Sequence, residues 1–278
     1  MRYWILISIL TSAMAAGTVA AGQQTSQQLA EKGHAIFMDV LAGDQSKLPE
    51  VIRLMEEARA ADETNQTNLY NLGRVYFYKA LTFNDGEALG KAEAVFARIL
   101  ELNPNYTEAL AFHGSILTAQ SQGRDIAKFM KGAEEMKTAI AKDPKNINNR
   151  IVLPFTARNF PPQAIAAIGN YDPVADLEFV SSAFDGNMFF YAPHADVVMK
   201  AFVGEAYLRK GDAEKANAKF QAALNVPKPA DPGERKGRDM LDALITARMN
   251  GGTTQLGNGG VISGCHSCHV SAPDKLTR

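Results

Sequence analysis

The chain has 278 residues, of which 46% are hydrophobic and 21% are charged, and 29 basic residues nearly balance 30 acidic ones. These values are typical of a globular protein, and they exclude the strongly basic surface that would bind nucleic acid or an anionic membrane. Two cysteines in the whole chain exclude a small scaffold that is held together by disulfides.

Residues 1–21 predict an export signal. Arg2 precedes an apolar stretch, YWILISIL, and the small residues TSAMAAGTVAAG follow it. This order is typical of a secretory signal peptide, here with cleavage after Ala20 or Ala21. The alternative is a retained membrane anchor, because residues 3–21 approach the length that spans a bilayer. Polar residues and glycine dilute the stretch, so cleavage is favoured. We expect a periplasmic or secreted protein that is not bound to the membrane.

Residues 22–145 predict a series of helical hairpins. Gly33, Gly73 and Gly114 recur at intervals of 40 and 41 residues, and apolar residues three and four apart accompany each of them. Apolar residues at this spacing form one stripe on a helix, and a glycine within the stripe lets a second helix approach closely. The segments FNDGEALG and QSQGRDIA supply the residues of two turns between helices.

Residues 146–194 do not follow this pattern. Five of the twelve prolines lie there, and proline cannot continue the interior of a helix. We expect an irregular helical insert, in which short helices and ordered loops pack on the hairpins.

Residues 195–249 return to the helical pattern. The segment AFVGEAYLRKGDAEKANAKFQAAL carries small and apolar residues at successive intervals of 3, 4, 5, 4 and 3, namely Gly204, Tyr207, Gly211, Ala216, Phe220 and Ala223. The segment GERKGRDMLDALITARM then predicts one amphipathic helix, with Leu241, Leu244, Ile245 and Met249 on one stripe. Such a helix would cap the last hairpin.

The spacing in residues 27–145 and 195–228 resembles the tetratricopeptide repeat (TPR). The resemblance implies an all-α fold, a right-handed superhelix of hairpins with a concave groove that binds a partner. A generic helical bundle is the alternative. By analogy with the repeat family, Tyr70, Arg74, Phe77 and Tyr78 should point partly toward the groove, where aromatic rings with an arginine suit partner binding. The alternative for these rings is that they pack against the neighbouring hairpin.

Residues 250–278 predict a haem-attachment segment behind a linker. Six of the fifteen residues from 250 to 264 are glycine, and SGCHSCHV follows. In an exported chain, C-x-x-C-H is the attachment motif of c-type cytochromes. The resemblance implies one covalent haem c, with thioether bonds to Cys265 and Cys268 and with His269 as the proximal ligand of the iron. A redox-active dithiol and a zinc site are the alternatives, but no βαβ unit precedes the motif and too few ligands surround it.

The sixth ligand of the iron is open, because no Met or His follows the motif. The candidates elsewhere in the chain are Met249, Met240, His194, His34 and His113. Met249 is the first candidate for the sixth ligand, although methionines are more often core residues than ligands. His113 is expected to pack within its own hairpin. A five-coordinate iron with an open position agrees with the sequence as well as any of these sixth ligands does. The tail is too short to bury a haem by itself, so the haem should pack against the helical domain or against another protein.

These features together predict an exported mono-haem c-type cytochrome that passes single electrons and docks to a redox partner through its TPR-like domain. An electron carrier is favoured over a catalyst, because no acid–base constellation is visible in the sequence. Two alternatives stay open. One is a periplasmic scaffold or assembly factor whose groove binds polypeptides, and the other is a haem enzyme or sensor that binds a small ligand at an open iron site.

Overall fold

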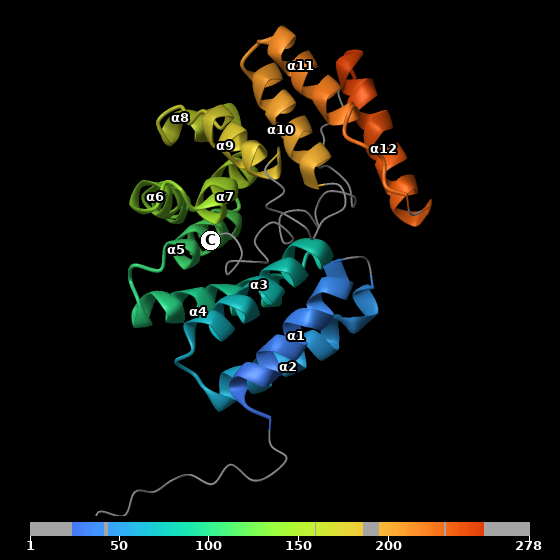
Figure 1. The fold of residues 1–278 in the computed structure, drawn as a ribbon. Helices are drawn as coiled ribbons and strands as arrows, with labels where there is room; N and C mark the ends of the chain where they lie inside the picture. The colour runs from blue at the N-terminus through green and yellow to red at the C-terminus, as the bar shows by residue number, and fades with distance from the viewer. Residues whose placement is uncertain (1–23, 42–43, 159, 186–194, 231, 253–278) are drawn as a thin grey trace, which may run out of the picture.

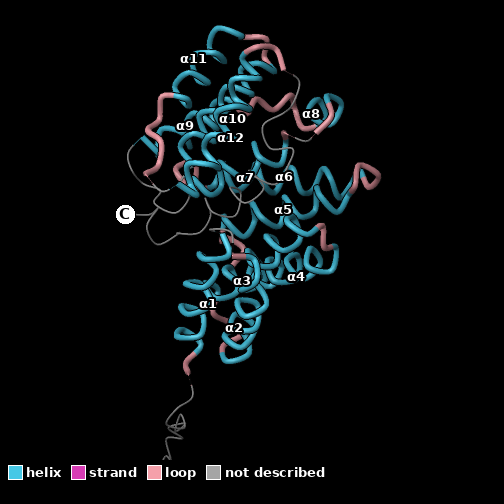
Figure 2. Tube along the Cα trace, turned by 90° about the vertical axis from the view of Figure 1, so that its right-hand side faces the viewer, coloured by secondary structure: helices cyan, strands magenta, loops and turns pink. Residues whose placement is uncertain are grey.

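The computed structural model describes residues 24–41, 44–158, 160–185, 195–230 and 232–252, and their regular structure is entirely helical (Figure 2). The elements are α1 (Ser26–Leu41), the short 3-10 helix η1 (Gln45–Lys47), α2 (Leu48–Ala61), α3 (Gln66–Phe83), α4 (Gly86–Leu102), α5 (Thr107–Ser121), α6 (Ile126–Lys142), α7 (Ile147–Ala157), α8 (Pro162–Ala167), α9 (Val174–Asp185), α10 (Ala195–Arg209), α11 (Ala213–Leu224) and α12 (Pro232–Met249). None of these described helices is long and apolar enough to cross a bilayer.

The helices stack as successive pairs along the chain (Figure 1). Four pairs pack as the hairpins that the sequence predicts: α1 with α2, α3 with α4, α5 with α6, and α10 with α11. The second helix of each of the first two pairs also contacts the first helix of the next pair. One hydrophobic core therefore runs through the stack, and the all-α expectation is confirmed for the described residues.

Glycine allows close contact between the two helices of each of these four hairpins. Each glycine of the predicted repeat lies in a first helix, at a point where a Cβ atom would press against the second helix. The residues that such an atom would meet are Met55 opposite Gly33, Phe96 opposite Gly73, Gly132 opposite Gly114, and Phe220 opposite Gly204. A larger residue would separate the helices and open the core between them.

Aspartate begins the second helix in three hairpins. The side chains of Asp85, Asp125 and Asp212 each accept a hydrogen bond from the backbone N–H three residues further on. This N-cap bond lowers the pKa of the Asp85 and Asp212 carboxyls, because it stabilises the charged form. Just before two of these caps, Asn84 and Gln122 adopt the left-handed conformation that ends the preceding helix. The two predicted turns are therefore confirmed.

The predicted insert contains three helices, α7, α8 and α9. α7 packs against α5 and α6, as the first helix of a further pair would, and α9 packs against both α7 and α10. Two helices of the insert thus continue the stack, while α8 lies in the connection between them. The repeat is invisible in the sequence here because α8 separates the two paired helices and α7 carries Pro154 in its interior.

α12 closes the C-terminal end of the described stack by packing on α11. Leu241 and Ile245 are fully buried and Leu244 and Met249 are partly buried, as the amphipathic pattern predicts. Because Leu241 and Ile245 lie one helical turn apart, they form the single stripe that caps the last hairpin.

Arg238 ties α12 to the end of α11. Its side chain is 1% exposed, and Nη2 donates hydrogen bonds to the backbone oxygens of Ala223 and Leu224, both at 3.1 Å. Nε donates to Asp242 Oδ1 at 2.6 Å. The last carbonyl groups of α11 are therefore satisfied by a buried, paired cation.

Candidate functional site

The first helices of the successive pairs meet along one face of the stack. The contacts that join them are Phe37 with Tyr78 (ring centroids 5.5 Å apart), Phe77 with Phe112 (5.5 Å), Ser115 Oγ with Thr156 Oγ1 (2.9 Å) and Phe155 with Phe202 (4.8 Å). These contacts join α1 to α3, α3 to α5, α5 to α7 and α7 to α10. The first helices therefore form one continuous inner face.

The aromatic residues of α3 mostly pack between hairpins. Tyr70 is fully buried, and its ring lies 5.9 Å from that of Phe112 and against two further aromatic rings. Arg74 and Tyr78 are also buried. These rings therefore pack against the neighbouring hairpin and do not line an open groove, because stacking of neighbouring hairpins covers the face of α3 that carries them. Of Tyr70, Arg74, Phe77 and Tyr78, only Phe77 also lines the cavity between α3 and α8.

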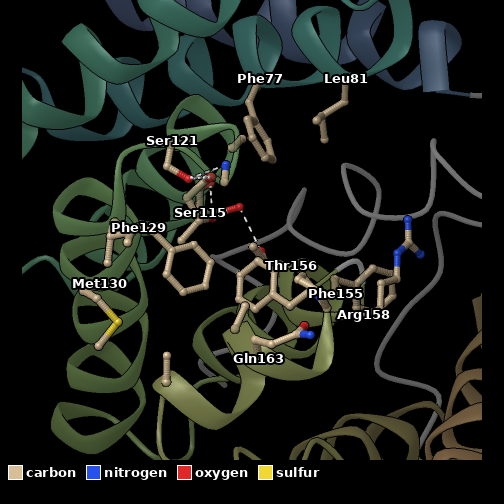
Figure 3. Close-up of a pocket in the computed structure, with 18 residues that line it drawn as sticks. Phe77, Leu81, Ser115, Ser121, Phe129, Met130, Phe155, Thr156, Arg158 and Gln163 are labelled. Atoms are coloured by element: carbon tan, nitrogen blue, oxygen red, sulfur yellow. Dashed lines mark hydrogen bonds between the residues drawn. The ribbon is translucent and has the colours of Figure 1, made fainter.

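A cavity of about 580 Å³ opens on the inner face between α3, α5, α6, α7 and α8 (Figure 3). Phe77 enters it from α3, Phe129 and Met130 from α6, Phe155 from α7, and Phe160 from the connection to α8. The rings of Phe129 and Phe160 contact each other edge-on at 4.8 Å. Four phenylalanine rings therefore line the cavity together with aliphatic side chains. Its volume lies in the range of pockets that hold cofactor-sized molecules, roughly 300 to 1,000 Å³.

Arg158 is the one charged residue among those that line the cavity. Its guanidinium lies 5.4 Å from the ring centroids of both Phe155 and Phe202. The hydroxyls of Ser115 and Thr156 bond to each other, and Thr156 also donates to the backbone oxygen of Val152 at 2.8 Å. Six of the eighteen lining residues are polar, and the only formal charge among the lining residues is positive. The arrangement suits a flat apolar molecule that carries an anionic group at one edge.

Large apolar side chains also surround the opening of the cavity. Leu81, Ile126 and Met130 are 42%, 73% and 37% exposed, and all three line the cavity. Single exposed apolar residues are ordinary, but a group of them around one opening is typical of a binding surface.

The C-terminal end of the described chain is anchored close to this face. Arg248 of α12 pairs with Glu205 of α10, with 2.8 Å between Nη2 and Oε2, and its Nη1 also donates to the backbone oxygen of Gly252. Glu205 lines a small second cavity together with Arg158, which also lines the large one. The chain therefore leaves the helical domain beside the inner face.

The predicted haem-attachment residues Cys265, Cys268 and His269 lie outside the described residues, as do His194 and the export signal. The described part of the chain contains no group of three or more His, Cys, Asp or Glu residues that could hold a metal ion.

The remaining ligand candidates lie away from the cavity. His113 is 7% exposed and its Nδ1 lies 2.6 Å from Glu135 Oε2 of α6, so it packs within its own hairpin as expected. Met240 is 50% exposed on α12, and His34 lies half-buried on α1. The sulfur of Met249 lies 3.7 Å from Gln221 Nε2 of α11. None of these four lines the cavity.

The cavity-lining side chains of α6 were not among the residues predicted from the sequence. Ile126, Phe129 and Met130 are spaced three and four residues apart in the first turns of the helix, in addition to its core stripe. This second apolar stripe is a signal that could have identified a binding surface, because a helix that packs on one side only needs one stripe.

No protein-family model matches the chain, and no curated protein matches it. Among solved structures, a TPR protein of Thermus thermophilus is similar over 78% of this chain and 98% of its own, with 16% identity and a TM-score of 0.54. A tetratricopeptide repeat protein of Parabacteroides merdae covers 88% of this chain and 84% of its own, with 17% identity and a TM-score of 0.47. A third similar structure is YrrB, described as a TPR protein with an unusual peptide-binding site. It covers 80% of this chain and 98% of its own, with 17% identity and a TM-score of 0.42.

The likeness to the Thermus protein, together with the stacked helical pairs, defines the class to which this fold belongs. The described chain is a TPR-like helical-repeat domain.

Proposed function

We propose that the protein is an exported mono-haem c-type cytochrome that transfers single electrons and docks to a redox partner through its TPR-like domain. The observation that carries the proposal is the motif C-x-x-C-H at residues 265–269, in a chain whose first 21 residues read as an export signal. The haem would supply an iron that cycles between Fe(III) and Fe(II) without proton transfer to a side chain.

The residues of the motif have separate roles. The sulfurs of Cys265 and Cys268 would hold the macrocycle through thioether bonds, and the imidazole of His269 would coordinate the iron. His266 lies between the two cysteines, where its side chain is expected to point away from the metal. The protein's contribution is therefore to fix the haem and one axial ligand at the end of a helical domain.

The helical domain is suited to carry such a group. Its cavity has the volume and the aromatic side chains that a large flat apolar cofactor requires, and Arg158 offers a positive charge for a propionate carboxylate. A haem left in water would expose a large apolar surface, which soluble proteins seldom tolerate. The residues present thus fit the group that the motif implies.

A partner protein is expected on the same domain. Stacked hairpins form an extended surface that repeat proteins use for binding, and the exposed Leu81, Ile126 and Met130 give this surface an apolar patch. This patch also favours the second candidate function, a periplasmic scaffold or assembly factor that binds polypeptides and carries a haem.

Mass spectrometry and mutation test the haem assignment. When the protein is made in a host that matures c-type cytochromes, its mass should exceed that of the signal-cleaved chain by about one haem, near 616 Da. His269→Ala should abolish the normal haem spectrum, whereas the matched control His266→Ala should change it little. Absence of the added mass, or the opposite ranking of the two variants, would overturn the proposal.

Redox titration and ligand binding separate the candidate functions. An electron carrier should show one reversible one-electron step, and its reduced form should bind carbon monoxide slowly. Rapid and stoichiometric carbon monoxide binding would instead support the haem enzyme or sensor, with an open iron position. A haem that no exported redox partner can reduce would favour the scaffold.

A further inference from the structure

We infer that the cavity between α3, α5, α6, α7 and α8 is the binding site of the chain's own haem, with Arg158 facing a propionate. The inference rests on the proposed function, since it assigns a place to the haem that residues 265–269 would carry. Nothing in the motif itself says where on the helical domain that haem packs.

The first argument is the chemistry of the cavity. Haem is a flat apolar ring with two anionic groups on one edge. Four phenylalanine rings, from three helices and from the connection to α8, line the cavity, and the only charged residue among those that line it is the cation Arg158. A lining that combines aromatic rings with one cation and no carboxylate matches that pattern of apolar surface and negative charge.

The second argument is the place where the described chain ends. Arg248 holds the backbone at Gly252 and pairs with Glu205, and Glu205 shares a small cavity with Arg158. One ion pair and one small cavity therefore connect the end of the described chain with Arg158. Twelve residues, 253–264, separate Gly252 from Cys265. The covalent geometry of the backbone lets a segment of this length span at most about 45 Å.

The third argument is that the cavity is open. Ala119 and Ala167 line it and are themselves exposed, so a group on a tether can enter without unfolding a helix. The apolar side chains Leu81 and Ile126 stand at the opening. A haem in this binding site would keep one edge near a surface that a redox partner can reach.

The test compares two neighbouring alanines of α8 in the haem-loaded protein. Ala167 lines the cavity, whereas Ala166 is also exposed but is not among the lining residues. Haem attachment is confirmed first by mass, so failure of the proposed function is seen separately. A haem held in a fixed asymmetric environment shows circular dichroism in its Soret band. Ala167→Trp should remove most of this signal without loss of haem, and Ala166→Trp should leave it unchanged.

Far-ultraviolet circular dichroism checks that both variants are folded. If Ala167→Trp fails to fold, Ala119→Trp fills the cavity from α5 and carries the same expectation. A full Soret signal in a folded cavity-filling variant would overturn the inference. The haem would then pack elsewhere, and the cavity would be left to a partner polypeptide.

Arg158 provides an independent readout. A cation beside the haem favours the reduced iron, which carries one positive charge fewer. Arg158→Gln should therefore lower the reduction potential, and Arg158→Lys should keep most of the wild-type value. A potential that is the same in all three proteins would contradict the assigned role of Arg158. A change of Soret dichroism on cavity filling together with a shifted potential would support the inference.

Discussion

Among the described glycines, Gly114 of α5 and Gly132 of α6 are the two where an added Cβ atom would come closest to another atom. A Cβ atom on Gly114 would lie 2.4 Å from the backbone oxygen of Gly132, and a Cβ atom on Gly132 would lie 2.4 Å from the backbone oxygen of Gly114. Ordinary contact begins at 3.4 Å, so Gly114→Ala requires the two backbones to separate by about 1 Å, that is 3.4 minus 2.4. Backbone cannot rotate away as a side chain can.

The energetic result follows from two opposed terms. Overpacking of this kind costs about 1–3 kcal/mol, and the backbone contact places Gly114→Ala at the upper end. The better helix propensity of alanine returns about 1 kcal/mol. We therefore expect Gly114→Ala to lower the free energy of unfolding by about 2 kcal/mol. The change lowers the melting temperature by roughly 4–8 °C in a domain of this size.

Gly90 of α4 is the matched control. It also lies inside a helix, but a Cβ atom there would meet nothing within 4 Å. Gly90→Ala should raise the free energy of unfolding by about 0.5–1 kcal/mol, because only the propensity term remains. Thermal and urea unfolding followed by far-ultraviolet circular dichroism measure both variants. The reasoning is refuted if Gly114→Ala is as stable as the wild type while Gly90→Ala behaves as expected.

Four further predictions concern buried groups and the cavity. Tyr70→Phe should stabilise the protein by about 1 kcal/mol, because the buried Tyr70 hydroxyl has no hydrogen-bond partner among the described residues. Burial raises the pKa of Tyr106 to about 12, so its folded form holds a proton that the unfolded chain releases near pH 10. Stability should therefore fall as pH rises from about 10 to 12, less steeply in Tyr106→Phe. Arg238→Met should cost about 3 kcal/mol, because it breaks a buried ion pair and leaves carbonyl groups of α11 unsatisfied. A haem in the cavity would meet Met130, the only lining residue with a thioether. If this sulfur is the sixth ligand of the iron, Met130→Leu should speed carbon monoxide binding in the haem-loaded protein.

Each of these predictions has a clear contrary result. Melting of Tyr70→Phe below the wild-type temperature would contradict the first prediction. An alkaline loss of stability as steep in Tyr106→Phe as in the wild type would contradict the second. Arg238→Lys should not restore stability, because an ammonium group lacks the planar fork of donors that reaches both carbonyls. Met249→Leu is the control for Met130→Leu. Faster carbon monoxide binding in Met249→Leu alone would instead identify Met249 of α12 as the sixth ligand.

The sequence by itself predicted the helical hairpins, because their signals are local. A glycine within an apolar stripe, an aspartate at a helix start and a left-handed residue in a turn each act within a few residues of their position. Gly73, Gly204 and Asp85 show this in the structure. The haem-attachment motif is local in the same sense, since Cys265 and His269 are four residues apart, and it stays a prediction.

The tertiary structure alone decided the cavity and the course of the described residues 146–158 and 160–185. Phe77, Phe129 and Phe160 come from three distant parts of the chain, and no spacing in the sequence relates them. Likewise, nothing in the sequence around Arg158 predicts that it is the only charged residue among those that line the cavity. Side chains of this kind are brought together only when the hairpins stack. Helix propensity and periodicity set each hairpin, but the burial of one pair against the next determines which residues share a surface.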